Sequence, residues 1–304
     1  MATYTSIDDL DLGQIAARYG WENLHLAALH GGAANSSFRA TAKQGDFVLT
    51  ILDNHDLAGA EALAARTEAL FRLGVPTTEV IPDVDGRTIS VISGRPVMVK
   101  RWIEGQVVDP LPSRLLSTAG ELLAHLHDLP QDVPDLPAKT RRLSPEHLQL
   151  IDEFPNRRFA DWLSERLDAV QREEVALPPA PDVVSHGDLF ADNLIVRPDD
   201  ELAVIDWETV SLDSALLDLG MSLLGLAKVD GRLDHDRAHQ IVTGYTKVRP
   251  LSDEEVAALP AEVEHAALII AFHRYHRHNI RFPDKRKCHL HEEMYGFVDS
   301  LAGF

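Results

Sequence analysis

The 304-residue sequence has a single cysteine, Cys288, and little positive charge, since Asp and Glu outnumber Lys and Arg by 48 to 29. One cysteine excludes an internal disulfide framework and a cysteine-rich zinc site. A formal charge of −19 argues against nucleic acid or an anionic membrane as the main partner. The composition favours a soluble enzyme whose anionic ligand arrives together with a divalent cation.

Long hydrophobic runs are also scarce. The longest conspicuous one, residues 266–272, is too short to cross a bilayer. Residues 1–13 are acidic and lack the basic and apolar regions of a signal peptide, so a cytoplasmic location is the default expectation. With 45% apolar residues and no internal repeat, the chain has enough hydrophobic material for a sizeable core.

The most informative segment is residues 185–193, which read Ser-His-Gly-Asp-Leu-Phe-Ala-Asp-Asn. It places Asp188 five residues before Asn193, and Asp206 follows thirteen residues after Asn193. This is the spacing of a phosphoryl-transfer loop followed by a metal-binding Asp. Asp188 is the candidate catalytic base, and Asn193 and Asp206 offer the hard oxygen ligands that Mg²⁺ prefers.

On its own, His-Gly-Asp is only a turn motif. Here, however, strand-like residues 183–184 and 194–196 flank the loop, residues 197–200 read as a hairpin turn, and the strand 202–205 ends at Asp206. The motif therefore stands in the structural context that its chemistry requires. The sequence predicts a kinase.

The chain changes character near its first third. Before residue 100 we expect strands and one main helix at 57–73, after a short helix at 5–19; after residue 110 the sequence is mostly helical. We therefore predict an α+β, bilobal, protein-kinase-like fold with an N-lobe over 1–100, a connector over 101–110 and a helical C-lobe over 111–304. The expected strands lie at 47–52, 78–81, 88–92 and 96–100, and the expected C-lobe helices at 113–128, 144–153, 157–175, 214–227, 234–248, 252–259 and 261–281.

Two segments are candidates for nucleotide binding. Small residues near 31–37 form a turn between strands, where Gly32, Asn35 and Ser36 are placed to approach phosphates. In a bilobal kinase the adenine pairs with the backbone of the connector, here near Arg101 and Ile103. An ordinary loop and an ordinary connector are the alternatives.

The third strand lacks the lysine with which kinases pair the ATP phosphates and a helix glutamate. Thr50 stands at that position, and Lys43 lies in a probable turn that makes it a poor substitute. Either another cation or additional backbone contacts hold the phosphates, or the enzyme is weakened. Glu61 is the expected helix residue facing this strand, with Glu68 as its competitor.

These motifs resemble the aminoglycoside phosphotransferase and choline kinase superfamily. The resemblance covers roughly residues 25–225 and is closest to the bacterial homoserine kinases of protein-kinase-like fold, on three further stretches. These are Phe-Val-Leu-Thr-Ile-Leu at 47–52, Gly-Val-Pro-Thr at 74–77 and Pro-Asp-Val-Asp-Gly-Arg at 82–87. The resemblance implies that Thr50 is a trait of the subgroup.

Carried over to this chain, the resemblance implies ATP and Mg²⁺ as cofactors, with Asp188 as base and Asn193 and Asp206 as metal ligands. It implies that His186 supports the loop through its imidazole and that Asp218 braces the loop by accepting backbone N–H bonds. Ser214 departs from the family, which often has proline there.

The acceptor must be recognised by the helical lobe. There the basic, aromatic segment 272–282 offers Arg274, His278 and Arg281 to a carboxylate such as that of homoserine. A solvated or dimer-forming helix is the alternative. The nearby group His289, His291, Glu292 and Glu293 fits no strong metal-ligand spacing and is better read as a surface polar patch.

Three functions compete. The first is a small-molecule kinase for homoserine, with choline, an aminoglycoside, an amino sugar or methylthioribose as alternative acceptors, in a monomer or homodimer. The second is a nucleotide-binding regulator that has lost turnover, which Thr50 suggests and the intact Asp188, Asn193 and Asp206 oppose. The third, a protein kinase, is disfavoured because Asp-Trp-Glu at 206–208 replaces Asp-Phe-Gly and no Ala-Pro-Glu follows.

Overall fold

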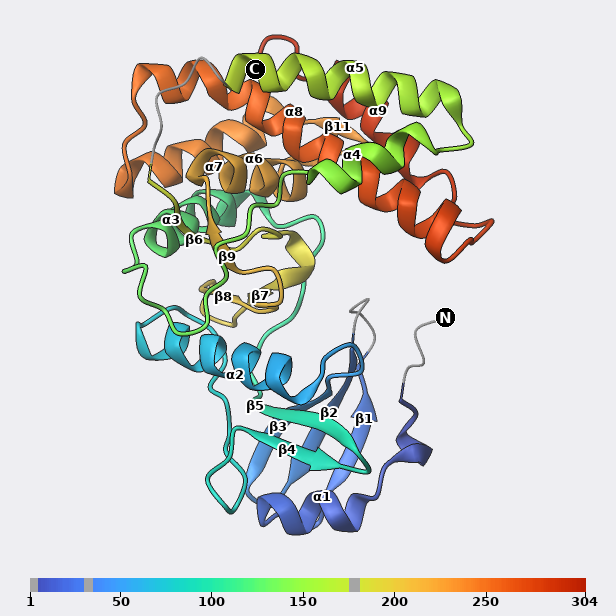
Figure 1. Cartoon of the computed structure of the whole chain (residues 1–304). Helices are drawn as coiled ribbons and strands as arrows, with labels where there is room; N and C mark the ends of the chain where they lie inside the picture. The colour runs from blue at the N-terminus through green and yellow to red at the C-terminus, as the bar shows by residue number, and fades with distance from the viewer. Residues whose placement is uncertain (1–4, 30–34, 175–180) are drawn as a thin grey trace.

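The computed structural model describes residues 5–29, 35–174 and 181–304. Two lobes lie one above the other, with the sheet of the N-lobe at one end and the packed helices of the C-lobe at the other (Figure 1). The expectation of an α+β, bilobal, kinase-like fold is confirmed.

The N-lobe is built on an antiparallel sheet with strand order β1-β2-β3-β5-β4. A two-residue turn joins the last two strands, with Ser93 at φ 51° and Gly94 at φ 77°, the positive values that a tight hairpin needs. The strands are β1 (His25–Ala28), β2 (Ser36–Ala42), β3 (Gly45–Ile51), β4 (Ile89–Ile92) and β5 (Arg95–Arg101).

One helix packs on each face of this sheet. Helix α1 (Leu12–Tyr19) closes a small core in which Ile15 meets Leu49 and Val99. Helix α2 (Leu57–Arg72) contributes Leu63 and Leu70 to the larger core that continues into the C-lobe. Alternation along each strand thus separates a sealed face from a face that looks toward the C-lobe.

Two sequence predictions for the N-lobe need correction. The expected helix 5–19 is a 3₁₀ turn, Ile7–Asp9, followed by α1, because Asp11 caps a separate helix by accepting from the Gln14 N–H. The expected strand 78–81 is reduced to a single bridge between Val80 and Lys100. The predicted helix 57–73 is confirmed within one residue.

The C-lobe begins after a connector that follows β5. Its first strong element is α3 (Leu116–His127), which crosses α7 (His235–Val248) so closely that Gly120 and Gly244 lie against backbone carbonyls of the opposite helix. The other elements are α4 (Pro145–Asp152), α5 (Arg157–Glu174), β6 (Val183–Ser185), β7 (Leu194–Val196), β8 (Leu202–Val204), β9 (Ser211–Asp213), α6 (Ala215–Leu226), β10 (Lys228–Val229), β11 (Arg232–Leu233), α8 (Asp253–Tyr275) and α9 (Glu293–Asp299), with short 3₁₀ turns at Ser113–Leu115, Ala191–Asn193 and Leu290–Glu292.

Helix α8 corrects a further prediction. The sequence predicts a break at Pro260, yet one helix runs from Asp253 to Tyr275 and ends in a π-helical turn, His276–Arg281. Proline removes one hydrogen bond from a helix, but Leu259, Ala261 and Val263 on either side are buried and hold the helix together. Tertiary packing therefore overrides the local preference.

The same helix also qualifies the prediction about hydrophobic runs. By length and composition alone, the 29-residue stretch Asp253–Arg281 could cross a membrane, with a mean hydropathy of 1.3. However, 61% of its apolar window is buried inside the fold. Buried Val263 and Ile269 belong to the main core, as expected for the central helix of a globular lobe.

Candidate active site

The catalytic loop leaves β6 and returns into β7, so its two key side chains lie on a rigid turn. Asp188 is half-buried, and Asn193 is buried. Asn193 Nδ2 donates to the backbone oxygen of Asp188 at 2.8 Å and lies 3.5 Å from its carboxylate oxygen Oδ2. The amide nitrogen of Asn193 is thus committed to the loop, which leaves the amide oxygen to face a ligand.

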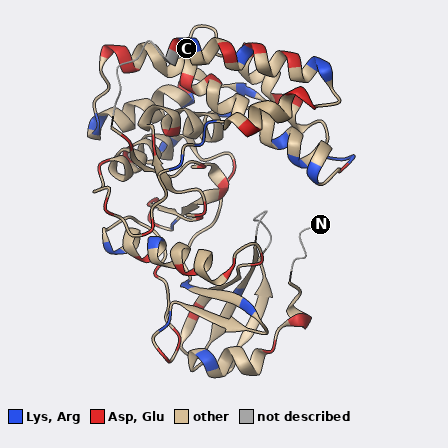
Figure 2. Ribbon diagram, viewed as in Figure 1, with Lys and Arg blue, Asp and Glu red and all other residues tan. Residues whose placement is uncertain are grey.

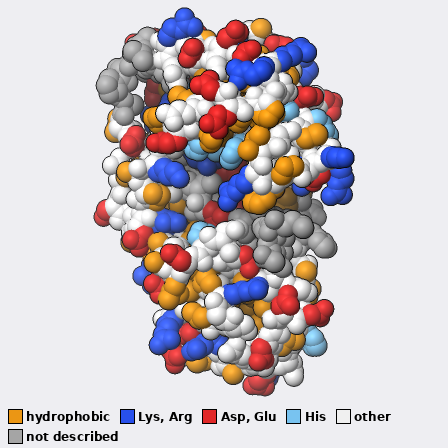
Figure 3. Space-filling view, turned by 45° about the vertical axis from the view of Figure 1, so that its right-hand side comes forward, with side chains coloured by type: hydrophobic (Ala, Val, Ile, Leu, Met, Phe, Trp, Pro, Cys, Tyr) orange, Lys and Arg blue, Asp and Glu red, His pale blue; other side chains and the backbone are white. Residues whose placement is uncertain are grey.

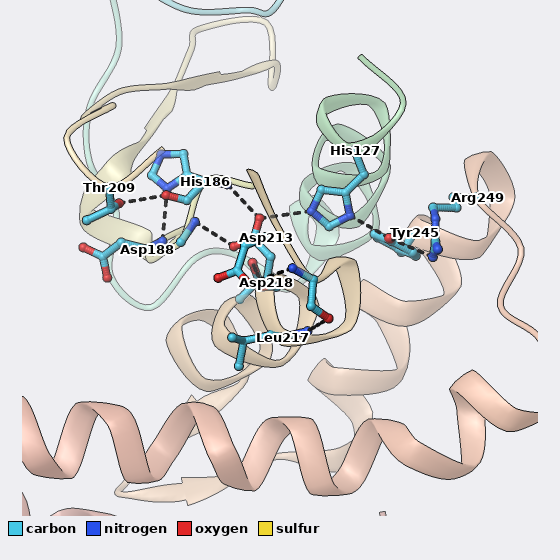
Figure 4. Close-up of polar contacts among 12 residues, drawn as sticks. His127, His186, Asp188, Thr209, Asp213, Leu217, Asp218, Tyr245 and Arg249 are labelled. Carbon is cyan, nitrogen blue, oxygen red and sulfur yellow. Dashed lines mark hydrogen bonds and ion pairs between the residues drawn. The ribbon is translucent and has the colours of Figure 1, made fainter. Parts of the chain in front are cut away.

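Asp218, at the start of α6, holds this loop from beneath. Its carboxylate accepts from the backbone N–H groups of His186 and Gly187, both at 2.7 Å, and from His127 Nε2 at 3.0 Å. Figure 4 shows that this network lies on one side of the loop, while the Asp188 carboxylate points away from it. The structure thus places Asp218 in the bracing position that the family resemblance implied.

A directed chain of hydrogen bonds completes the support. Arg249 Nη1 donates to Tyr245 Oη at 3.3 Å, and Tyr245 Oη lies 2.7 Å from His127 Nδ1, which leaves Nε2 of His127 to face Asp218. Burial alone would raise the pKa of Asp218, but the contacts with His127 and the loop N–H groups outweigh it and lower this pKa. The buried carboxylate therefore stays charged.

His186 supports the loop through both ring nitrogens. Nε2 donates to the Ile205 carbonyl at 3.2 Å, and Nδ1 accepts from the backbone N–H of Asp188 at 3.3 Å. Burial lowers the pKa of His186, so the ring is neutral with its proton on Nε2. The imidazole links the loop of Asp188 to the strand end that carries Asp206, which is the supporting position the sequence suggested.

Asp206 follows β8 and is exposed toward the cleft, with a positive φ of 68°. The next residue, Trp207, is buried and donates from Nε1 to Thr77 Oγ1 at 2.9 Å. Thr77 in turn donates to the Val204 carbonyl at 2.6 Å. Thr77, which follows α2 in the chain, therefore fixes the end of β8 from which Asp206 projects.

Gly187 explains how a distant arginine reaches the loop. Its φ is 75°, and a Cβ at this position would lie 3.1 Å from Cδ of Arg141 and 3.2 Å from the Thr209 carbonyl. The backbone N–H of Arg141 is itself fixed to Asp213 Oδ2 at 2.6 Å. A side chain at position 187 would push Arg141 away from the catalytic carboxylate.

The electrostatics of Asp188 suit a base. Burial raises the pKa of Asp188 to about 7, against the opposing effect of the Arg141 guanidinium; the Asp192 and Asp206 carboxylates add to the increase. A carboxyl with this pKa exchanges its proton near neutral pH, where general acid–base catalysis is most effective.

The donor set fits a divalent cation shared with a nucleotide. Asn193 and Asp206 provide one amide and one carboxylate oxygen, and Mg²⁺ commonly takes few protein ligands together with phosphate oxygens and water. Among residues 5–29, 35–174 and 181–304, no group of three or more His, Cys, Asp or Glu side chains is arranged for a metal. The reading of residues 289–293 as a surface polar patch needs correction, because His291 is buried between the rings of Phe159 and Tyr275.

The predicted phosphate turn is only partly described. Gly32 lies outside the described residues. Asn35 donates to the Glu208 carboxylate, which connects β2 to the segment of Asp206. The prediction for Ser36 is corrected, because its backbone N–H and its buried hydroxyl both donate to Asp53, at 3.2 Å and 2.7 Å.

Two further nucleotide predictions are corrected by the structure. Glu61 is exposed on α2 and does not face the strand. Arg101 cannot pair adenine through its backbone, because its N–H donates to the Glu79 carbonyl at 2.9 Å and its carbonyl accepts from Thr78 at 2.8 Å. Within the described chain, the Ile103 backbone has no such partners, so Ile103 stays a prediction for the adenine contact.

Thr50 is buried on β3, where its hydroxyl lies 3.3 Å from that of Ser37. It therefore occupies the expected strand position and packs within the sheet. A threonine brings no positive charge to a phosphate, so the three explanations that the sequence offered for this position stay open.

The predicted acceptor residues are largely engaged elsewhere. Arg274 forms an ion pair with Glu293 and donates to the Leu290 carbonyl. Arg281 is exposed beside the Phe282 ring, and His278 lies in the same π-helical turn. Figure 2 shows the basic residues gathered at this end of the C-lobe, so the exposed end of the segment around Arg281 forms the solvated surface that the sequence left open as the alternative.

A different set of groups faces Asp188. Arg141 is close enough to Asp188 and to His273 to lower the pKa of each, and its buried Nε has no hydrogen-bond partner among the described residues. Burial and Arg141, with His147 and His276 nearby, lower the pKa of His273 to about 4. Figure 3 shows His side chains beside basic ones in the hollow between the lobes. Sequence reasoning missed Arg141, whose only local sign is a pair of arginines in a loop.

The chain is similar in sequence to known phosphotransferases. The family model described as "Phosphotransferase enzyme family" matches residues 25–251. A homoserine kinase from Beijerinckia indica is 29% identical over 283 residues, covering 90% of this chain and 87% of that protein. A homoserine kinase from Brucella ovis is 27% identical over 281 residues, covering 88% and 84%.

Solved structures share the fold at low sequence identity. A microcompartment-associated aminopropanol kinase superposes with a TM-score of 0.74 at 20% identity, covering 96% of this chain and 95% of that one. Amicoumacin kinase, solved with AMP-PNP and Ca²⁺, gives a TM-score of 0.74 at 14% identity over 96% and 94%.

Proposed function

Because the chain belongs to the phosphotransferase enzyme family, we propose that it transfers the γ-phosphoryl group of ATP to the hydroxyl of a small metabolite, with homoserine as the preferred acceptor. One observation carries this proposal. The Asp188 carboxylate points into the cleft near Asn193, on a loop whose backbone is fixed by the buried Asp218. A cytoplasmic enzyme without nucleic-acid or membrane partners, monomeric or dimeric, is part of the same proposal.

The chemistry follows from these positions. The acceptor hydroxyl donates its hydrogen bond to Asp188, and its oxygen attacks the γ-phosphorus in line while the bond to the bridging oxygen of ADP breaks. The hydroxyl proton passes to Asp188. Mg²⁺, held by Asn193 and Asp206, would neutralise charge on the phosphate oxygens. The loose transition state requires mainly positioning and charge neutralisation.

Arg141 supports an acceptor that carries a carboxylate. Its guanidinium lies beside Asp188, and its Nε is buried without a partner in the described chain. A buried donor is stabilised when a ligand accepts its hydrogen bond, and arginine is suited to carboxylates. His273, with its pKa near 4, is neutral at pH 7 and adds a hydrogen-bonding group without further charge. Homoserine has both the hydroxyl and the carboxylate.

The relatives named homoserine kinase support the same acceptor, at 27–29% identity. Choline, aminoglycosides, amino sugars and methylthioribose are the alternative acceptors within this class. A cationic acceptor such as choline is disfavoured by the positive charge of Arg141 next to the base.

The test is ADP release with Mg-ATP across homoserine, choline, an aminoglycoside, an amino sugar and methylthioribose, with Asp188→Asn as control. We expect turnover on homoserine that depends on Asp188. Turnover on another acceptor would keep the mechanism and replace the substrate. Nucleotide binding without turnover would favour a regulator, the second candidate, for which the threonine at position 50 is the supporting observation.

A further inference from the structure

The face of the N-lobe sheet that looks toward the cleft carries a lysine on a different strand from the expected one. Strands β3 and β5 are paired so that Thr50 lies opposite Met98 and Val48 lies opposite Lys100. Because side chains alternate along a strand, Thr50 and Lys100 point to the same face. The opposite face is the sealed core under α1, which contains Leu49 and Val99.

The carboxylates of the catalytic half lie across from this lysine. Glu208 is held by Asn35 of the N-lobe and lies 3.8 Å from His55 at the start of α2. These contacts bring the segment 206–208 under the sheet. Burial lowers the pKa of the partly buried Lys100, while Asp206 and Glu208 act on its charge in the opposite direction. The ammonium group of Lys100 is therefore within electrostatic range of Asp206, the proposed metal ligand.

The other N-lobe cations around this face are already engaged. Arg39 is bonded to Asp46 at 2.7 Å and stacks over Trp102. Lys43 is exposed in the β2–β3 turn and bonded to Glu22 at 2.9 Å. The backbone of Lys100 is paired within the sheet, but its Nζ makes no side-chain hydrogen bond and no ion pair within 4.0 Å in the described parts of the chain.

We infer that Lys100 supplies from β5 the phosphate-binding charge that Thr50 does not supply from β3. The inference rests on the proposed use of ATP. A lysine ammonium on a flexible stem is a compact phosphate ligand. A partly buried cation without a direct partner is costly until a counter-charge binds, and the phosphates of a nucleotide provide that charge next to Asp206.

The decisive experiment measures binding of ATP, ADP and AMP by calorimetry with Mg²⁺ present, in the wild-type protein and in Lys100→Met. We expect the affinity for ATP and ADP to fall about 10- to 100-fold, the effect of losing one charge-assisted hydrogen bond. The affinity for AMP should change far less, since AMP lacks the phosphates that Lys100 reaches. Lys43→Met, which removes an exposed lysine of the same lobe, should bind all three like the wild type.

A second variant protects the test against a folding defect. The double variant Thr50→Lys/Lys100→Met places a lysine at the β3 position on the same face, so its ATP affinity should recover. Thermal unfolding of Lys100→Met and of the double variant shows whether either protein has lost stability. Equal weakening of ATP and AMP in Lys100→Met, or no weakening of either, would overturn the inference alone. A wild-type protein that binds no ATP would overturn the proposed function as well.

Discussion

The catalytic loop and the ligand-facing groups around it satisfy their polar atoms in opposite ways. Under the loop, Asp218 accepts from two backbone N–H groups and from His127, and the chain of donors continues to Arg249. Toward the cleft, Arg141 keeps a buried Nε without a partner in the described chain. The buried polar atoms under the loop have all these hydrogen-bond partners within the protein. The Arg141 Nε gains a partner only when a ligand binds.

This difference assigns the catalytic step to the braced loop and the choice of substrate to the groups that face the ligand. A loop whose hydrogen bonds are internal holds Asp188 in place before any substrate arrives, as preorganised catalysis requires. Groups that lack protein partners instead distinguish ligands, because a ligand that fails to satisfy them leaves a buried donor unpaired. The following predictions, in decreasing order of effect, test this division.

Asp206→Ala should abolish metal-dependent turnover, because Asn193 alone offers too few oxygen ligands for Mg²⁺. The measurement is kcat over a range of Mg²⁺ concentrations. Asp199→Ala, which removes an exposed carboxylate from the β7–β8 turn, serves as the control and should keep wild-type activity. If Asp206→Ala retained kcat within about tenfold, its assignment as a metal ligand would be wrong.

Asp188→Asn should lower kcat by about 10²–10⁴, the usual contribution of a positioned acid–base group. ATP affinity should remain unchanged, because the loop is held from the opposite side by Asp218. Single-turnover kinetics and nucleotide titration together separate the two effects. Asp199→Asn, which changes an exposed carboxylate of the β7–β8 turn, is the matched control and should keep the wild-type kcat. A parallel loss of ATP binding would contradict the assignment of Asp188 as a base.

Asp218→Asn should destabilise the protein by about 3 kcal/mol, because an amide, with one acceptor oxygen, cannot keep all three hydrogen bonds that the buried carboxylate accepts from His186, Gly187 and His127. The pKa of Asp218 is lower in the folded state than in the unfolded state. Its stabilisation is therefore present above the unfolded pKa and is lost as pH falls through the folded pKa. Urea unfolding at pH 7 and under increasingly acidic conditions should show the difference between the two proteins shrinking in acid, and a pH-independent difference would exclude this explanation.

Arg141→Met should raise the KM for homoserine about 10- to 100-fold through loss of one charge-assisted interaction, with little change in the KM for ATP. Arg274→Met is the informative partner variant, because that arginine is paired with Glu293. Steady-state kinetics on both variants decides between the two acceptor sites. A larger increase of the KM for homoserine in Arg274→Met than in Arg141→Met would instead place the acceptor site at the basic end of α8.

Gly244→Ala should cost about 1–3 kcal/mol, the usual penalty for overpacking. A Cβ at this position would lie 1.9 Å from the Ser117 carbonyl on α3. Gly296→Ala, in α9, is the control, since its added Cβ would meet only the Gly231 carbonyl at 3.7 Å. Thermal unfolding of the two variants should differ clearly, and equal midpoints would mean that α3 and α7 can separate without cost.

The parts of this molecule that were predictable from sequence are those encoded locally. The spacing of Asp188, Asn193 and Asp206 lies within one short stretch, and the helix at 57–73 has a regular apolar pattern and a clear stop. The helix break predicted at Pro260 is absent, because the burial of α8 outweighs the tendency of proline to end a helix. Arg141 and Asp213 are 72 residues apart, so no local pattern reveals where that arginine lies. The position of Lys100 beside Thr50 cannot be predicted from sequence, because only the pairing of β5 with β3 shows which face of the sheet its side chain occupies.

The most direct test of the central claim compares L-homoserine with 3-aminopropan-1-ol, which has the same hydroxyl and amine but no carboxylate. We predict that the wild-type protein phosphorylates homoserine with a kcat/KM at least about 10² higher, because the analogue leaves the Arg141 donor unpaired. Equal or greater efficiency on the analogue would show that the site does not recognise a carboxylate and would contradict the assignment of homoserine as acceptor.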